Sequence, residues 1–110
     1  MSKVIDYYFT VVSPWTYLGS YRLAEIAKRH GAEVSVKPVN LGEIFPRTGG
    51  LPLPKRSPER QAYRMAELKR WREHLGIPIN LEPKFFPAND ELAACMIIAA
   101  GDSGGDPLAL

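Results

Sequence analysis

Residues 4–14 read VIDYYFTVVSP and decide how the chain begins to fold. The run from Val4 to Val12 is rich in β-branched and aromatic residues, which favours a mostly buried strand. Ser13 is a good helix N-cap, and Pro14 suits the first helical position because its missing N–H is not needed there. This stretch therefore predicts a strand that passes through a short turn into a helix.

The following residues predict the rest of a βαβ unit. Apolar side chains recur at helical spacing from Tyr17 to Ala27, and a helix would end near His30 and Gly31. Residues 33–39 then alternate between polar and apolar side chains, as expected of a strand. A strand, a helix and a strand joined this closely predict parallel pairing and a right-handed crossover.

The middle of the chain predicts a loop and then a long helix. Prolines and glycines interrupt residues 41–57 and predict a loop without regular elements. A second Ser-Pro pair, Ser57 and Pro58, predicts a helix that ends at Gly76. After an extended connection over residues 77–87, the sequence predicts a further helix.

Asn89 or Asp90 is expected to cap that further helix. Asp106 and Pro107 then look like another helix start, close to the last residue of the sequence. Two strands alone do not make a stable sheet. We therefore expect this chain to be one half of a longer protein, completed by a second copy in a homodimer or by a C-terminal half.

The composition excludes several classes of protein. The 110 residues carry a net charge of +2 and a single cysteine, so an internal disulfide scaffold is excluded, and no cluster indicates a metal site. Cys95 lies among apolar residues of a predicted helix, and we expect it to be buried. No stretch has the apolar length of a signal peptide or a membrane helix, which predicts a cytoplasmic protein without a membrane partner.

Half of the basic residues lie between Lys55 and Arg72. Within this segment, Arg56, Arg60 and Arg64 recur at every fourth position, so they form one stripe that can attract an acidic ligand. A solvated helix face is the alternative interpretation. Glutamates between the basic residues weaken the positive field, and we therefore expect no nucleic-acid partner.

The turn at Ser13 is the best candidate for a functional site. Open α/β sheets bind ligands at the C-terminal ends of their parallel strands, and the N-terminus of a helix stabilises anions. A serine hydroxyl at this point can donate a hydrogen bond to a thiolate or an oxyanion. The alternative is that Ser13 only caps the helix. No glycine-rich loop follows the strand, so a dinucleotide site is not predicted.

Residues 9–18, FTVVSPWTYL, resemble the hallmark segment of the 2-hydroxychromene-2-carboxylate isomerase family, which is related to kappa-class glutathione transferases and DsbA-like proteins. The resemblance continues through residues 37–38, 75–78 and 86–89. It implies a thioredoxin-like α/β fold, in which residues 1–40 are the first βαβ part. Residues 41–57 would be a Gly/Pro-rich loop, and residues 58–110 the beginning of an inserted α-helical domain.

The same resemblance implies a glutathione-dependent cis/trans isomerase that acts on aromatic 2-oxo acids. Residues 13–16, SPWT, carry no cysteine, so dithiol redox chemistry is excluded at this turn. Ser13 would instead hold the glutathione sulfur as a thiolate. Addition of that thiolate to a conjugated double bond allows rotation, and elimination restores the alkene in the other geometry.

Four further site residues follow from the resemblance. Lys55 would contact a glutathione carboxylate, or else is a solvated lysine, and Asn89 would reach glutathione, or else caps a helix. Trp15 and Tyr17 would line the pocket of a small aromatic substrate, or else pack the first helix onto the sheet. Gly50 departs from the family, which has an asparagine near this position that contacts glutathione.

Two other functions remain open at this stage. The first is a kappa-like glutathione transferase, which would use the same serine. The second is a non-catalytic thioredoxin-like fragment that is active only together with a missing C-terminal half.

Overall fold

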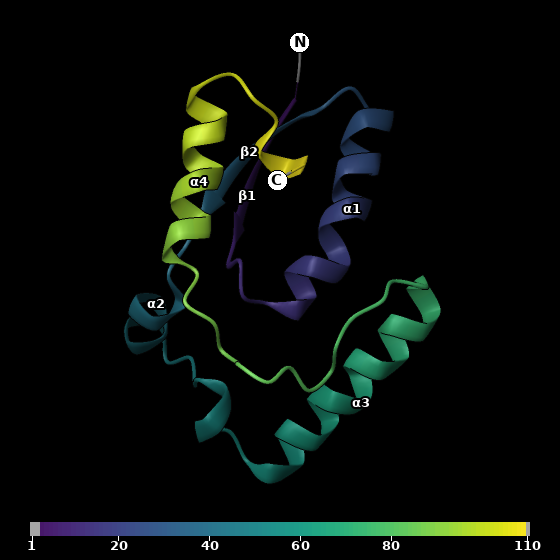
Figure 1. Ribbon diagram of the computed structural model, residues 1–110, viewed down its shortest axis with the longest axis vertical. Helices are drawn as coiled ribbons and strands as arrows, with labels where there is room; N and C mark the ends of the chain where they lie inside the picture. Colours follow the sequence, from purple (N-terminus) through teal and green to yellow (C-terminus); the bar gives the residue numbers. More distant parts are fainter. Residues whose placement is uncertain (1–2, 110) are drawn as a thin grey trace. The chain divides into compact units, whose positions relative to one another are not determined.

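The computed structural model describes residues 3–109, and these residues form two compact units. The first unit comprises the chain up to Val39 and again from Pro87, and the second comprises Asn40–Phe86. The elements of the first unit are β1 (Val4–Phe9), α1 (Pro14–Arg29), β2 (Glu33–Pro38), α4 (Glu91–Asp102) and the 3-10 turn η2 (Pro107–Ala109) (Figure 1). Those of the second are α2 (Leu41–Thr48), the 3-10 turn η1 (Leu53–Lys55) and α3 (Pro58–Leu75).

The sheet of the first unit confirms the predicted parallel pairing. β1 and β2 are in register from Val4 opposite Glu33 to Phe9 opposite Pro38. α1 connects them. His30 is its C-cap residue, and the backbone N–H of His30 donates to the carbonyl of Ile26. The predicted strand–helix–strand order at the start of the chain is therefore correct.

β1 is shorter and more exposed than the sequence predicted. It ends at Phe9, because the backbone N–H of Ser13 donates to the carbonyl of Thr10 at 3.3 Å and closes a turn. Its side chains alternate between the two faces, so Tyr8 is 63% exposed while its neighbours are half-buried. The prediction of a mostly buried strand reaching Val12 is wrong on both counts.

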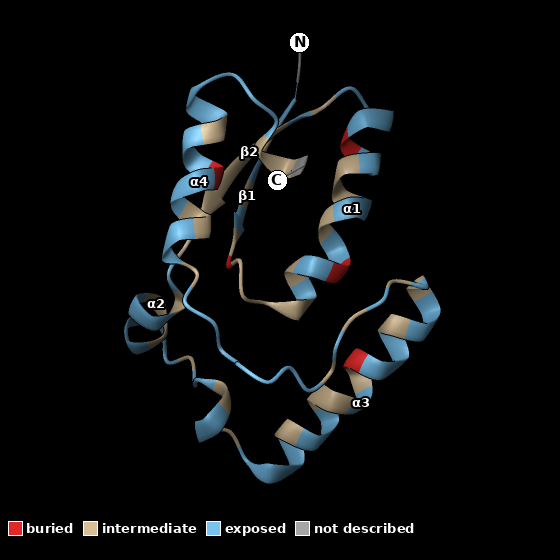
Figure 2. Cartoon of the chain, in the orientation of Figure 1, coloured by how far each residue is buried: buried red, intermediate tan, exposed pale blue. Residues whose placement is uncertain are grey.

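The core of the first unit lies where α1 and α4 meet the sheet. Figure 1 shows the two strands between these helices, and both helices contact β2. Leu18 and Ala27 of α1 and Ile97 of α4 are buried, and the buried positions of both helices stand out in Figure 2. The hydroxyls of Tyr7 and Ser20 share a hydrogen bond of 2.8 Å, which attaches β1 to α1.

Cys95 is exposed, which corrects the expectation that it is buried. The buried position of α4 is Ile97, with Ala93 and Ala100 half-buried on the same side. Two residues along a helix rotate a side chain by about 200°. Cys95 therefore lies on the side of α4 opposite Ile97.

α2 lies inside the stretch that the sequence assigned to a loop, so that prediction is wrong for Leu41–Thr48. Asn40 caps the helix: its side-chain oxygen accepts the N–H of Gly42 at 2.9 Å. Pro46 stands within the helix and removes one backbone hydrogen bond. Gly49, at φ 76°, ends it in the left-handed conformation that glycine adopts without strain.

α3 confirms the helix predicted after the second Ser-Pro pair. The Ser57 side chain accepts the N–H of Arg60 at 3.3 Å, and Gly76 ends the helix at φ 66°. Leu68 is only 2% exposed and is the most buried side chain of the second unit among the described residues. The helix thus has both of the end residues that the sequence indicated.

α4 belongs to the unit that contains the sheet, because it packs on β2. The predicted domain boundaries placed residues 58–110 together; the compact units separate Asn40–Phe86 from the residues that follow. The helix start predicted at Asp106 is the short turn η2, where the Asp106 carboxylate accepts the N–H of Leu108 at 3.1 Å. No helix within residues 3–109 has the length and apolar character needed to cross a membrane.

Candidate active site

The candidate site begins with Ser13, at the point where the turn after β1 becomes α1. Its Oγ accepts the backbone N–H of Thr16 at 3.3 Å, and its own carbonyl accepts the N–H of Tyr17 at 3.2 Å. The side chain is half-buried. Ser13 is therefore a helix N-cap, as the alternative interpretation of this residue predicted.

Capping leaves the hydroxyl proton of Ser13 available. A serine hydroxyl is one donor and also accepts, and the cap uses Ser13 only as an acceptor. Within residues 3–109, no acceptor takes this proton. Pro14 has no N–H, and the N–H groups of Thr16 and Tyr17 bond to Ser13, which leaves the N–H of Trp15 at the start of α1. The positive end of the helix dipole lies beside it. Ser13 can thus cap the helix and donate to an anion at the same time.

A hydrogen bond between distant residues joins the segment before this turn to the start of α4. The Thr10 hydroxyl donates to Oδ2 of Asp90 at 3.3 Å, and Thr10 is 8% exposed. Thr10 precedes Ser13 by three residues, and Asp90 lies immediately before α4. This contact joins the end of β1 to the start of α4. The sequence did not identify Thr10 as part of the site, and Asp90 was expected to cap a helix.

Asn89 lies in the same unit as Ser13, next to that contact. Its side-chain oxygen accepts the N–H of Glu91 at 3.0 Å, while Asp90, the residue at the N-cap position, makes no capping hydrogen bond with its side chain. Asn89, rather than Asp90, therefore makes the expected capping hydrogen bond at the start of α4. Its amide NH2 group, which the cap does not use, is exposed and can donate to a ligand.

The two aromatic residues near Ser13 are partly exposed. Trp15 is 40% exposed and Tyr17 is 52% exposed. The buried positions of α1 are Leu18 and Ala27 instead, so these two aromatic side chains are not the ones that fill the core. Their role in a substrate pocket stays a prediction.

Lys55 lies in the second compact unit, at the end of η1, and is exposed. Gly50 belongs to the same unit. A Cβ at Gly50 would lie 2.5 Å from the Phe45 ring, so this position admits no side chain unless that ring moves. An asparagine at this position would require the Phe45 ring to move.

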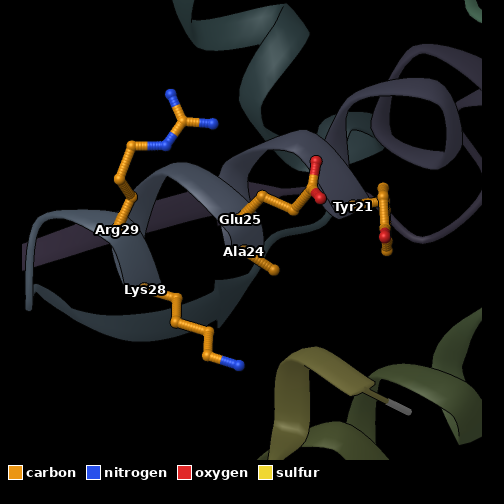
Figure 3. A pocket seen from close by; sticks show the side chains of 5 residues that line it. All are labelled: Tyr21, Ala24, Glu25, Lys28 and Arg29. Carbon is orange, nitrogen blue, oxygen red and sulfur yellow. The ribbon is translucent and has the colours of Figure 1, made fainter.

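A separate pocket lies along α1. It is lined by Tyr21, Ala24, Glu25, Lys28 and Arg29, whose side chains Figure 3 shows along the helix. These residues follow Ser13 by at least two helical turns, so the pocket is distinct from the Ser13 turn. Among residues 3–109, no group of three or more His, Cys, Asp and Glu side chains is placed to hold a metal ion.

The parallel strands β1 and β2, joined by α1, are compatible with a thioredoxin-like domain. The DSBA-like thioredoxin domain family matches residues 4–109, and the chain belongs to this family. This match confirms the predicted thioredoxin-like α/β fold class and places the Ser13 turn within it.

The more specific relatives are isomerases. The chain is 28% identical over 103 residues to a 2-hydroxychromene-2-carboxylate isomerase of Sphingobium xenophagum, covering 93% of this chain and 52% of that protein. A protein of the same name from Pseudomonas putida is 29% identical over 87 residues, covering 78% and 40%. The chain thus spans about half the length of the curated relatives it matches.

A solved structure of a 2-hydroxychromene-2-carboxylate isomerase has the same fold. It aligns with 94% of this chain and 59% of its own, with a TM-score of 0.55 and 22% identity. The predicted resemblance to this isomerase family is confirmed by the sequence relatives and by this shared fold.

Proposed function

We propose that this chain supplies the thiolate-binding turn of a glutathione-dependent cis/trans isomerase that acts on aromatic 2-oxo acids. The observation that carries the proposal is the hydroxyl of Ser13, which caps α1 as an acceptor and keeps its proton for a ligand. The names of the isomerase relatives support the reaction class.

The residues present fit a thiolate better than a dithiol redox couple. Residues 13–16 contain no cysteine, and the single cysteine of the chain, Cys95, lies on α4. Glutathione would supply a nucleophilic sulfur that adds reversibly to a conjugated double bond. Ser13 donates a hydrogen bond to that sulfur, and the N-terminus of α1 favours its negative charge, so both lower the thiol pKa.

Two other residues are proposed to orient glutathione. Asn89 would donate its free amide N–H to the peptide backbone of glutathione while its oxygen caps α4. Lys55 would pair with a glutathione carboxylate, which suits its exposed ammonium group. Trp15 and Tyr17 would contact the aromatic ring of the substrate.

Calorimetric titration with glutathione tests the proposal, on the chain alone and on the chain mixed with the C-terminal half of a relative. We expect saturable binding that Ser13→Ala weakens. S-methylglutathione has no thiol, so its affinity should not change in that variant. If neither sample binds glutathione, the proposal fails. Binding only in the mixture would favour a fragment that acts together with its other half.

Asn89 has a matched control in the same chain. Asn80 makes the same kind of local turn, in which its side-chain oxygen accepts the N–H of Glu82 at 3.1 Å. Asn89→Ala is expected to weaken glutathione binding, because the ligand loses one hydrogen-bond donor. Asn80→Ala should leave the affinity unchanged. Equal effects of the two substitutions would remove Asn89 from the site.

A further inference from the structure

A stripe of three arginines lies at the start of α3. Arg56 precedes the helix, while Arg60 and Arg64 lie in its first two turns. Arg56 and Arg64 are half-buried, whereas Arg60 is exposed. The two outer arginines of the stripe are therefore in a different environment from the central one.

The Arg56 side chain is held in place from one side only. Its Nε donates to the carbonyl of Leu51 at 2.9 Å, and its own carbonyl accepts the side-chain amide of Gln61 at 2.9 Å. The bond to Leu51 holds the guanidinium, and the bond from Gln61 holds the backbone of Arg56. The two terminal nitrogens of the guanidinium have no acceptor among residues 3–109. Four N–H donors of Arg56 thus remain available.

Arg64 is placed against an aromatic ring. Its guanidinium carbon lies 5.6 Å from the centre of the Phe86 ring. Burial lowers the pKa of Arg64, and the neighbouring positive charge of Arg56 lowers that pKa further. Arg56 and Arg64 are thus two half-buried positive charges on the same stripe, and one of them faces an aromatic ring.

Within residues 3–109, no carboxylate forms an ion pair with either guanidinium. The ion pairs of this part of the chain are Lys37 with Asp6 and Arg70 with Glu67. Glu59, in the first turn of α3, makes no ion pair with the stripe. Two neighbouring positive charges without a counter-ion are unfavourable, and a bound anion would relieve their repulsion.

We propose that Arg56 and Arg64, beside the Phe86 ring, form a binding site for the carboxylate of a small-molecule ligand. Arginine presents parallel N–H donors that match the two oxygens of a carboxylate, and such charge-assisted pairs are stronger than neutral hydrogen bonds. This inference rests on the proposed function, because that function determines which ligand carries the carboxylate. The carboxylate belongs either to an aromatic 2-oxo acid substrate or to glutathione.

Nuclear magnetic resonance of the arginine Nε–Hε groups tests this site directly. The chain would be titrated with phenylpyruvate, with glutathione, and with phenylacetamide as a neutral control. We expect the Arg56 and Arg64 signals to shift in a saturable way with one or both of the acids, and not with the amide. The acid that shifts them at the lower concentration identifies the source of the carboxylate.

Arg60 provides the matched control on the same stripe. Arg56→Gln and Arg64→Gln should each weaken carboxylate binding about ten- to a hundred-fold, as expected for the loss of a charge-assisted hydrogen bond. Arg60→Gln should change it less than about two-fold, because an exposed charge that makes no contact acts only through a screened field. Arg64→Lys keeps the charge but loses the paired donors, and it should bind with intermediate affinity.

Two results would overturn the inference. One is the absence of saturable shifts in the folded wild-type chain. The other is an equal loss of affinity in Arg60→Gln and Arg64→Gln, which would indicate only a general positive field. The two proposals can also fail separately. If the arginines bind a carboxylate but Ser13→Ala leaves the affinity for glutathione unchanged, the arginine site is retained and the proposed function is contradicted.

Discussion

The helices α1 and α3 begin with the same two residues, serine followed by proline, and with the same cap. The Oγ atoms of Ser13 and Ser57 each accept a backbone N–H from the third residue of the helix, Thr16 and Arg60, at 3.3 Å. The local sequence and the local hydrogen bond are therefore alike. A difference in function between the two serines must come from their surroundings.

The surroundings of the two serines differ clearly. Ser13 is half-buried and follows a parallel strand whose end is joined to α4 by the bond between Thr10 and Asp90. Ser57 is exposed and follows the short turn η1. The comparison teaches that a Ser-Pro pair specifies a helix start, whereas the tertiary contacts around it determine whether the serine can serve a ligand.

The largest expected difference between the two serines is catalytic. Ser13→Ala should lower the isomerase kcat by about a hundred-fold or more, as found when one hydrogen bond to a developing charge is removed. Ser57→Ala should leave kcat unchanged. Steady-state kinetics of the active assembly measures both. Equal activities of the two variants would reduce Ser13 to a cap.

The second prediction concerns the contact present only at the first serine. Thr10→Val and Asp90→Ala should each lower the free energy of unfolding by about 1–2 kcal/mol, since each removes one partner of a partly buried hydrogen bond. The double variant should lose less than the sum of the two. Urea denaturation of all four proteins measures this coupling. Strict additivity would show that the bond contributes nothing.

The third prediction is that the two caps contribute equally to stability. Ser13→Ala and Ser57→Ala should each lower the free energy of unfolding by about 1 kcal/mol, the usual cost of losing a serine cap. Threonine at either position retains the capping oxygen and serves as the control. A much larger loss at Ser13 would mean that its hydroxyl proton already has a structural partner.

The smallest expected effect concerns an ion pair on the exposed face of the sheet. The Nζ of Lys37 lies 3.0 Å from Oδ1 of Asp6 and 5.2 Å from the centre of the Tyr8 ring. The hydrogen bond to Asp6, and after it that to Tyr8, raises the Lys37 pKa above its ordinary value of 10.5. The interactions of Lys37 therefore stabilise the folded state fully when the pH is below that ordinary value. This stabilisation is lost as the pH rises through the raised pKa of Lys37.

Lys37→Met should accordingly lower the urea midpoint slightly at neutral pH, and the difference from wild type should vanish at strongly alkaline pH. The effect is small because both charged groups are exposed and screened by salt. Lys69→Met is the control at both pH values, because Lys69 lies at an exposed position of α3 and makes no ion pair within residues 3–109. A difference that grows with rising pH would contradict the sign of the shift.

The elements with local start and stop residues could be predicted from the sequence. α3, between Ser57 and Gly76, is correct at both ends, and so is the parallel strand pair. α2 was missed because the prolines and glycines of its segment concealed a cap at Asn40. The exposure of Cys95 was missed because an apolar helix does not reveal which of its sides packs on a sheet.

The parts of the site that depend on local sequence could likewise be predicted, whereas the contact between distant residues could not. Ser13 stands at a strand–helix junction that the sequence alone defines, and the structure places Asn89 in the same unit. The bond between Thr10 and Asp90 joins residues 80 positions apart, so no local pattern could indicate it. Lys55 belongs to the second unit, and its part in the site stays a prediction.

The ultraviolet absorbance of the glutathione thiolate tests the central claim most directly. Glutathione would be titrated with acid and base while bound to the wild-type chain, to Ser13→Ala and to Ser57→Ala, each mixed with the C-terminal half of a relative where binding requires it. We predict a thiol pKa below the usual value of about 8.5 for the wild type and for Ser57→Ala, and a return toward that value in Ser13→Ala. The same thiol pKa in all three proteins would contradict it.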